Sequence, residues 1–390
     1  MNDAPLCGRT RLERADHWAP LLRGVLACAL CAAGCSSSAK HADDMGAADA
    51  SIHDASIHDA AAPPMGKDGP VELPNGAPGI EFDDIQWAPH LRKVIVPAGR
   101  TGSVMLIDPD TSEVSELKGL TKSDKYMVAS GFIPVGTRYG STAATEADRY
   151  VAVLDGTAKT LNIFDPATLL RVSSIPLDGP ADYVHYVGST REIWVTRPSA
   201  SMLDVYSLPK SGTPKPTKLV SIAVSGGPES LVIDETRGRA YTNTLTGGKT
   251  YAIDLSTHAI VATYMNSCSY ALGVALDETR GFAFVICGEN GDSVSLDLNH
   301  AGAVLNRQNG GSQANILAYS PSLHHLYSPS GKTSQIFVMD VLDSGKLTLL
   351  GKLPGASRGF SAAADDRGHV WVIDPDHGRV IRATDSFASH

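Results

Sequence analysis

Pairs of adjacent apolar residues recur along the chain, and each pair predicts a β-strand that is buried on both faces. The fourteen residues of these pairs are Val94 and Ile95, Val151 and Ala152, Ile193 and Trp194, Ala240 and Tyr241, Ala283 and Phe284, Leu326 and Tyr327, and Trp371 and Val372. A further strand is predicted before each pair, marked by Ile85, Thr142, Val184, Leu231, Val274, Leu317 and Ala362, of which only Thr142 is polar. The pattern therefore predicts seven units, each made of several short strands.

Two identical segments give the length of the repeat. Asp-Glu-Thr-Arg-Gly occupies 234–238 and returns at 277–281, so the period is about 43 residues. A period of this size, with several short strands per unit, is typical of a blade of a β-propeller. We predict an all-β, seven-bladed β-propeller over residues 70–390 of the 390-residue chain.

The two ends of the repeat region are irregular. Blade seven ends early, because too few residues follow Asp385 to form its outer strand. The segment Gly-Pro-Val-Glu-Leu-Pro at 69–74 reads as a short strand without a blade of its own. We predict that this N-terminal strand completes blade seven and removes its exposed sheet edge. An insertion is also expected between Thr121 and Ala144, where the repeat is longer than elsewhere.

Residues 1–34 have the layout of an export signal. Arg9, Arg11 and Arg14 precede a short apolar run at 24–34, which is too short to remain in a bilayer as a spanning helix. The run ends in Ala-Ala-Gly-Cys-Ser, which resembles the lipobox of bacterial lipoproteins, although Ala32 stands where that family more often has leucine. The resemblance implies that Cys35 is lipidated and that residues 1–34 are removed. An ordinary secretory signal is the alternative.

Residues 35–69 are rich in Ala, Ser, Asp and His and contain no run that could form a core. We predict a disordered tether that separates the propeller from the membrane of the cell envelope. His53, Asp54, His58 and Asp59 lie in a duplicated Ser-Ile-His-Asp-Ala segment of this tether. Weak metal capture by these side chains is conceivable, but we interpret the segment as a solvated spacer.

The formal net charge of −9 argues against one class of partner. A negatively charged surface repels the phosphate backbone, so we expect no nucleic acid. We expect the propeller to be a monomer that touches the membrane only through its lipid.

The repeats resemble the YVTN-type family of seven-bladed propellers, which are bacterial extracytoplasmic proteins. The resemblance is carried in blade four by Leu231 to Asp234, Arg237 and Gly238, Ala240 to Asn243, and Ala252 to Asp254. Some relatives in that family are lactonases, and many are binding or surface proteins. The resemblance therefore leaves two functions open, because a fold alone does not select one.

Known catalytic and cofactor motifs are absent from the sequence, so we predict no cofactor, metal or catalytic set. The triplets at 248–250 and 331–333 end like phosphate-binding loops but are read as turns. The segment 108–112 begins like a calcium loop but lacks the later glycine and glutamate that such a loop requires. His324 and His325 are read as a solvated turn.

Cys268 and Cys287 are the only cysteines after Cys35. They are expected at neighbouring ends of two antiparallel strands of blade five, in a compartment that permits oxidation. We predict a disulfide between them; two buried thiols are the alternative.

A candidate ligand site lies where the inner strands begin. Asp83, Asp182, Glu229 and Asn315 open four of these strands, and Arg100 and Arg197 lie in loops that can reach the same face. We interpret this mouth of the central channel as a surface for a cationic or metal-bridged polar ligand, since crowded carboxylates repel one another without a cation. The alternative is that the acids merely solvate a water-filled channel.

Two functions follow. The first is a membrane-tethered, non-enzymatic module that binds a protein, a glycan or a small molecule. The second is a lactonase-like hydrolase with its site at the mouth of the channel.

Overall fold

The computed structural model describes residues 66–124, 139–288 and 290–388. The predicted signal at 1–34, nearly all of the predicted tether at 35–69 and most of the insertion after Thr121 lie outside the described residues. Within these described ranges, none of the helices has the length and apolar character needed to cross a membrane. The helices there are the short 3-10 turns η1 (Pro198–Ala200) and η2 (Leu298–His300).

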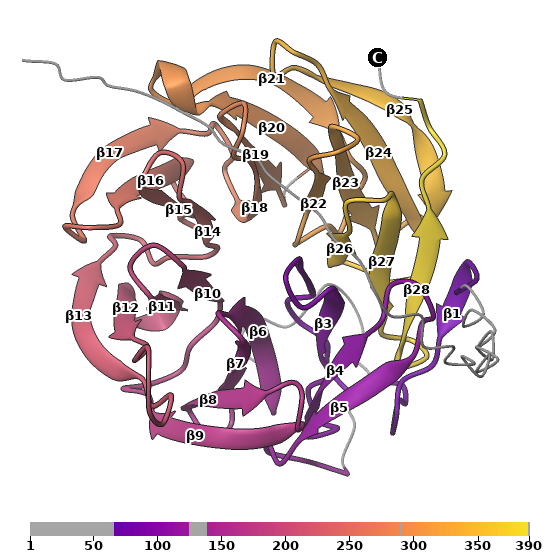
Figure 1. Cartoon of the computed structure of the whole chain (residues 1–390). Coiled ribbons are helices and arrows are strands. Elements are labelled where there is room, and N and C mark those ends of the chain that lie inside the picture. Colours follow the sequence, from indigo (N-terminus) through magenta and orange to yellow (C-terminus); the bar gives the residue numbers. More distant parts are fainter. Residues whose placement is uncertain (1–65, 125–138, 289, 389–390) are drawn as a thin grey trace, which may run out of the picture. The chain divides into compact units, whose positions relative to one another are not determined.

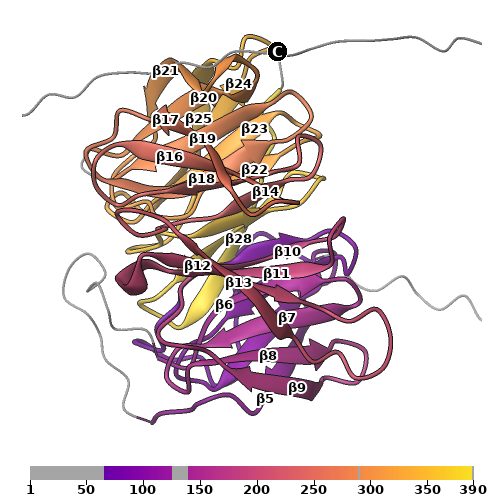
Figure 2. The ribbon, with the colours of Figure 1, turned by 90° about the vertical axis from the view of Figure 1, so that its left-hand side faces the viewer.

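Seven four-stranded antiparallel sheets follow one another around a ring, which confirms the predicted seven-bladed β-propeller (Figure 1). In blades one to six the first strand of each sheet is innermost and the fourth lies at the rim. The side view shows the blades as separate twisted sheets (Figure 2). The strands of blades one to three are β2 (Gln86–Ala88), β3 (Lys93–Pro97), β4 (Ser103–Ile107), β5 (Val114–Lys118), β6 (Ser141–Ala147), β7 (Tyr150–Asp155), β8 (Thr160–Asp165), β9 (Leu170–Pro176), β10 (Val184–Val187), β11 (Glu192–Arg197), β12 (Met202–Ser207) and β13 (Thr217–Ala223).

The remaining blades repeat this arrangement, and each strand again pairs with the next along the chain. The strands of blades four to seven are β14 (Val232–Asp234), β15 (Arg239–Asn243), β16 (Lys249–Asp254), β17 (Ile260–Met265), β18 (Ala271–Asp277), β19 (Phe282–Cys287), β20 (Asp292–Asp297), β21 (Ala303–Asn309), β22 (Ala318–Ser320), β23 (His325–Ser330), β24 (Gln335–Val341), β25 (Leu347–Pro354), β26 (Ala362–Ala364), β27 (His369–Asp374), β28 (Arg379–Thr384) and β1 (Gly69–Val71).

The N-terminal strand β1 completes blade seven, as predicted. It pairs antiparallel with β28, and Pro70 lies opposite Ile381 (Figure 1). Just before β1, the carboxylate of Asp68 accepts hydrogen bonds from Arg382 Nη1 at 2.8 Å and from the Thr384 hydroxyl at 2.7 Å. These contacts join the two ends of the propeller, so that blade seven has the same four strands as the others.

The core consists of seven apolar clusters, one between each pair of neighbouring blades. The predicted apolar pairs explain this arrangement, because successive side chains of a strand point to opposite faces of its sheet. In β27, Trp371 packs toward blade one and Val372 packs toward blade six. All fourteen residues of the pairs are buried, which confirms that the second strand of each blade lies between two neighbours.

Glutamate side chains join neighbouring blades at the turns between their first and second strands. Glu235 of blade four accepts backbone hydrogen bonds from Gly188 at 2.6 Å and Ser189 at 2.9 Å in blade three. Glu278 of blade five accepts the backbone N–H of Thr236 in blade four at 2.7 Å. The repeated Asp-Glu-Thr-Arg-Gly segment is thus a connection between blades, because its glutamate holds the turn of the preceding blade.

Candidate functional site

A cavity of about 820 Å³ occupies the centre of the ring, and all seven blades contribute to its wall. This volume lies within the range of cavities that hold small molecules in proteins. The wall is built from the inner strands and from the turns that follow them in blades one to four. The candidate site is therefore a preformed channel. Its wall is longer on the side of blades one to four, where the turns after the inner strands also line it.

The two sides of the channel wall differ in chemistry. Blades five to seven contribute mainly small or apolar residues, which are Val274, Ala275, Ile316, Leu317, Ala318, Ala362, Ala363 and Ala364, together with Gly273 and Tyr319. Blades one to four contribute most of the hydrogen-bonding side chains, among them Gln86, Thr145, His185 and Ser230. A bound molecule would meet an apolar surface on one side and polar groups on the other.

His185 is a polar group of this wall with unused hydrogen-bonding capacity. It lies in β10 and is half-buried, and the surrounding wall excludes enough water to lower its pKa to about 4. The ring is therefore neutral at pH 7, with one donor and one acceptor nitrogen. Neither nitrogen forms a hydrogen bond with any other residue that the structure describes. The next residue, Tyr186, also lines the cavity, and burial raises the pKa of its hydroxyl.

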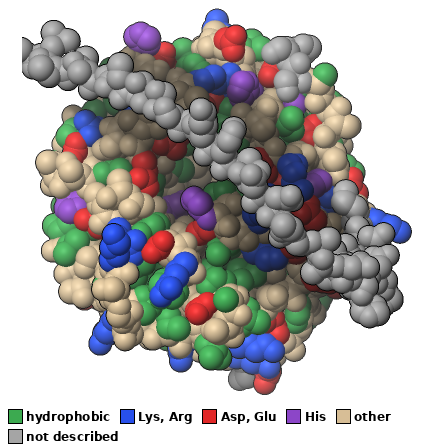
Figure 3. Space-filling view, in the orientation of Figure 1, with side chains coloured by type: hydrophobic (Ala, Val, Ile, Leu, Met, Phe, Trp, Pro, Cys, Tyr) green, Lys and Arg blue, Asp and Glu red, His purple; other side chains and the backbone are tan. Residues whose placement is uncertain are grey.

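Charged side chains line the end of the cavity at the turns of blades two to four. Arg191 donates to Asp148 at 3.0 Å, which satisfies one oxygen of that carboxylate. Arg149 instead lies over the ring of Tyr150 and donates to its hydroxyl at 2.7 Å. Among the described residues, no carboxylate forms a direct ion pair with Arg149, although the hydroxyl of Tyr150 and the nearby Asp165 and Asp148 raise its pKa. Figure 3 shows one face of the ring, on which basic, acidic and histidine side chains lie near the centre.

The sequence placed the candidate site next to the channel wall rather than on it. Asp83, Asp182, Glu229 and Asn315 each directly precede a residue that lines the cavity, namely Asp84, Tyr183, Ser230 and Ile316. Asp83, Asp182 and Asn315 are buried, and Glu229 is half-buried. The structure therefore brings the four positions to the start of the inner strands, as expected, but the residues that line the cavity lie one position further along the chain.

Both predicted arginines form ion pairs with acids other than Asp83, Asp182 and Glu229. Arg100 donates to Glu81 at 3.1 Å and lies over the ring of Tyr139. Burial raises the pKa of Glu81, although the neighbouring Arg100 opposes this change.

Arg197 donates to the buried Asp204 at 3.0 Å, in the third strand of its own blade. Burial would raise the pKa of Asp204, but hydrogen bonds from Ser221, Lys218 and Arg197 outweigh that effect and lower it. The guanidinium groups of both Arg100 and Arg197 are thus held by acids elsewhere in the structure.

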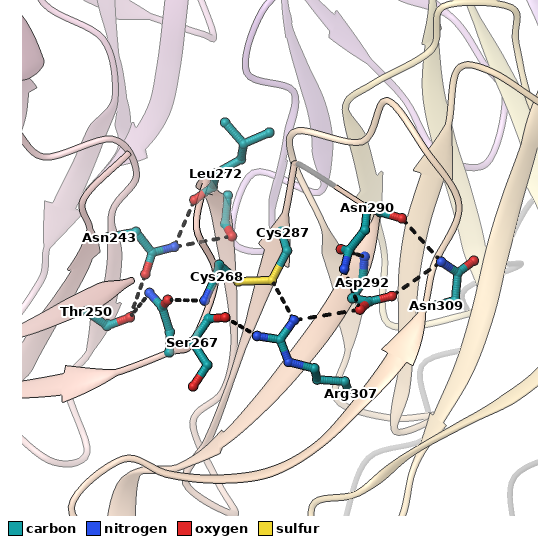
Figure 4. Close-up of a disulfide and its surroundings, with 12 residues drawn as sticks. Asn243, Thr250, Ser267, Cys268, Leu272, Cys287, Asn290, Asp292, Arg307 and Asn309 are labelled. Atoms are coloured by element: carbon teal, nitrogen blue, oxygen red, sulfur yellow. Dashed lines mark hydrogen bonds and ion pairs between the residues drawn. A yellow bond between two sulfur atoms is a disulfide. The ribbon is translucent and has the colours of Figure 1, made fainter. Parts of the chain in front are cut away.

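Cys268 and Cys287 form a disulfide in the structure, with their Cα atoms 5.2 Å apart (Figure 4). Both residues are buried. Arg307 covers the bond, with Nη1 3.7 Å from Cys287 Sγ, and also contacts the backbone oxygen of Ser267. The disulfide fixes the loop that enters β18 to the end of β19, next to the channel wall at Gly273.

The interpretation of His324 and His325 as a solvated turn is wrong for one of them. His324 is exposed, whereas His325 begins β23 and is fully buried. Its Nδ1 lies 2.7 Å from Asp385 Oδ2, and Tyr327 donates to the same oxygen at 2.7 Å. The reason is that the chain beyond β28 returns to blade six and carries a carboxylate that compensates the buried imidazole.

Sequence reasoning missed His185 and Arg149. A signal for His185 was present. In each blade one residue directly follows the inner-strand position that is Ile85 in blade one and Val184 in blade three. This residue is apolar in five blades and polar only at Gln86 and His185. Arg149 carried no comparable signal. It lies in a turn, and the residue pattern of a turn does not show which side chains face a cavity.

Comparisons with known proteins identify the fold but not a family. No family model and no curated protein sequence matches this chain. Solved structures with a similar fold include hydrazine synthase of Kuenenia stuttgartiensis, at 14% identity over 81% of this chain and 98% of that chain with a TM-score of 0.63. A chain of a mitotic checkpoint complex matches at 14% identity over 80% of this chain and 93% of that chain, with a TM-score of 0.60.

The β-propeller domain of Cps50 (Swd1) from Myceliophteria thermophila matches at 11% identity over 80% of this chain and 99% of its own length, with a TM-score of 0.61. At these identities the likeness shows the fold alone. The resemblance to YVTN-type propellers and to bacterial lipoproteins stays a prediction. The chain is a seven-bladed β-propeller with a central cavity of the size that holds a small molecule.

Proposed function

We propose that this protein is a binding module of the bacterial cell envelope that holds a small organic molecule in its central channel. One observation carries the proposal: a preformed cavity of about 820 Å³ has an apolar wall on one side and hydrogen-bonding groups on the other. Such a combination is typical of small-molecule sites, in which apolar contacts provide affinity and a few polar groups fix orientation. Lipid on Cys35 would hold the module at the membrane.

A lactonase-like hydrolase is the second candidate, because histidine, arginine and glutamate all line the same cavity. The glutamates, however, already have structural partners. Glu146 accepts the backbone N–H of Leu91 at 2.7 Å, and Glu235 accepts those of Gly188 and Ser189. Because these carboxylates already hold backbone N–H groups of a neighbouring blade, their oxygens are less available to take a proton from water, and the geometry favours binding over hydrolysis.

A thermal-shift screen of the intact protein against metabolites and lactones tests the proposal. We expect a compound that raises the melting temperature with increasing concentration and that is recovered unchanged, since ligand binding to the folded state stabilises it. Consumption of a lactone at a rate proportional to protein concentration would favour the hydrolase instead.

The tether is tested separately by metabolic labelling with a fatty-acid analogue. The wild type should be labelled and a Cys35→Ala variant should not. Equal labelling of both proteins would contradict lipidation at Cys35 and leave the proposal for the channel unaffected.

A further inference from the structure

Three of the carboxylates that line the channel already have hydrogen-bonding partners. Glu146 and Glu235 are occupied by backbone N–H groups, and Asp148 is paired with Arg191. In contrast, Arg149 has no ion pair with a described residue, and His185 has a free N–H as well as a free acceptor. The unsatisfied capacity at the polar side of the cavity therefore fits a ligand that carries acceptor oxygens.

Arg149 is placed to contact a ligand at the end of the cavity. It follows β6 in the turn between β6 and β7, and its guanidinium is held by the hydroxyl and the ring of Tyr150. Because one Nη atom is used in this contact, the other donors of the guanidinium remain available. Arginine binds carboxylates strongly, since two parallel N–H groups match the two oxygens.

The wall formed by blades five to seven favours a ligand that also has an apolar part. Val274, Ala275, Leu317, Ala318 and Ala363 line the cavity, and each borders it with the small part of its hydrocarbon group that is left exposed by the clusters between blades. An uncharged apolar body would remove this surface from water, at a gain of roughly 25 cal/mol per Å² of buried apolar area. A small polar anion such as phosphate would leave the wall without a partner.

Resting on the proposed function, we infer that the channel binds an organic carboxylate with an apolar body. Arg149 binds the carboxylate, the apolar body lies against the wall of blades five to seven, and His185 offers a hydrogen bond to a polar group inside the channel. The net charge of −9 does not oppose this arrangement, because exposed charges beyond about 8 to 10 Å are largely screened at physiological ionic strength. The contact with Arg149 is local, and Asp148 and Asp165 lie near the same guanidinium.

Three probes with one hydrocarbon chain test the inference. Binding of decanoate, decanol and decylammonium to the intact protein is measured by isothermal titration calorimetry, below the concentration at which each probe forms micelles. We expect decanoate to bind at least about fivefold more tightly than decanol, and decylammonium to bind most weakly.

Variants of two exposed arginines distinguish a direct contact with the carboxylate from an effect of the protein's net charge. Arg149→Gln should weaken decanoate binding by about fivefold to tenfold and leave decanol binding unchanged, whereas Arg149→Lys should restore part of the affinity. Arg171→Gln on the outer strand β9 is the control, because it removes the same charge away from the cavity. It should leave the binding of decanoate unchanged.

Each outcome decides the inference. Equal binding of the three probes, preference for decylammonium, no binding of decanoate, or an equal loss in the Arg149→Gln and Arg171→Gln proteins would overturn it. These results would not overturn the proposed function, which fails only if the screen of metabolites finds no ligand or if ligands bind outside the channel. The two failures are therefore distinguishable.

Discussion

Oε1 of Glu235 lies 2.6 Å from the backbone nitrogen of Gly188, which belongs to the preceding blade. The same contact recurs between Glu278 and the backbone N–H of Thr236 at 2.7 Å, one blade further along the ring. The chain thus uses a carboxylate in each of these two repeats to fix the turn of the preceding blade. In blades three and four these turns carry Gly188 and Glu235, which line the cavity, so the contacts between blades also shape the candidate site.

Replacing Glu235 with alanine should lower the free energy of unfolding by about 1 to 2 kcal/mol, because two backbone N–H groups lose a charged acceptor. The loss should be at the low end of this range, since the side chain is exposed and water can replace it. Chemical denaturation of the wild type and of Glu235→Ala provides the measurement. Glu113→Ala, which removes an exposed carboxylate from a turn at the rim, should leave stability unchanged and serves as the control.

The buried pair of His325 and Asp385 should make stability dependent on pH. Burial raises the pKa of Asp385, but hydrogen bonds from His325 and Tyr327 outweigh burial and bring the pKa below its ordinary value of 3.8. A carboxyl group with a lowered pKa in the folded state stabilises the protein above its unfolded pKa, and this contribution disappears as the pH falls. The wild type should therefore be more stable than Asp385→Asn at pH 5, by about 1 to 3 kcal/mol.

The difference between these two proteins should shrink below about pH 4, in step with protonation of the carboxylate. Urea denaturation at several pH values between 5 and 2.5 is the measurement, with the fully exposed Asp343→Asn as a control. A difference that stays constant over this range would contradict the role assigned to the Asp385 carboxylate.

The disulfide between Cys268 and Cys287 closes a short loop in blade five, with a sequence separation of 19. A loop of this size is expected to contribute about 3 kcal/mol by restricting the unfolded chain. A Cys268→Ala, Cys287→Ala double variant should be less stable by that amount, as measured by thermal or chemical unfolding. A non-reduced digest of the wild type should contain one peptide pair joined by these residues, and recovery of both peptides as free thiols would refute the pairing.

Closure of the ring by β1 should protect the edge of β28. A chain that begins at Pro74 lacks β1 and Asp68, so the outward hydrogen-bonding groups of β28 lose their partner strand. Its β28 amides should exchange with deuterium much faster than those of a chain that begins at Gly66, as followed by mass spectrometry. Equal exchange in the two proteins would show that β1 does not contribute to closure.

The sequence contained enough information for the fold because the repeat makes the same prediction seven times. Apolar pairs such as Trp371 and Val372 could be placed between blades, since a strand alternates its side chains between two faces. The early end of blade seven at Asp385 made closure by an N-terminal strand the consistent solution. Each of these inferences depends on the periodic pattern of apolar residues, which can be seen in a single sequence.

The candidate site could be predicted only in part, because it depends on side-chain directions at the ends of strands. The sequence showed where the inner strands begin, and from it we predicted Asp182 and Glu229 as ligand-binding residues. The neighbouring Tyr183 and Ser230 line the cavity. The sequence also could not show that Arg197 is held by Asp204, since the two residues lie on neighbouring strands but are not directly opposite each other. Positive charge in a turn, as at Arg149, has no periodic signature at all.

The most direct test of the central claim compares ligand capture by the wild type and by a protein whose channel is blocked. Val232 lies in β14 and is a half-buried part of the cavity wall, so Val232→Trp should fill the channel. Leu170→Trp places the same side chain on the outer rim, where Leu170 is 65% exposed, and serves as the control. Both variants should first be shown to melt within a few degrees of the wild type.

The three proteins are incubated with a metabolite extract, and bound compounds are identified by affinity-selection mass spectrometry. We predict that the wild type and Leu170→Trp retain the same small molecule and that Val232→Trp does not. Retention of that molecule by all three proteins would contradict a binding site in the central channel.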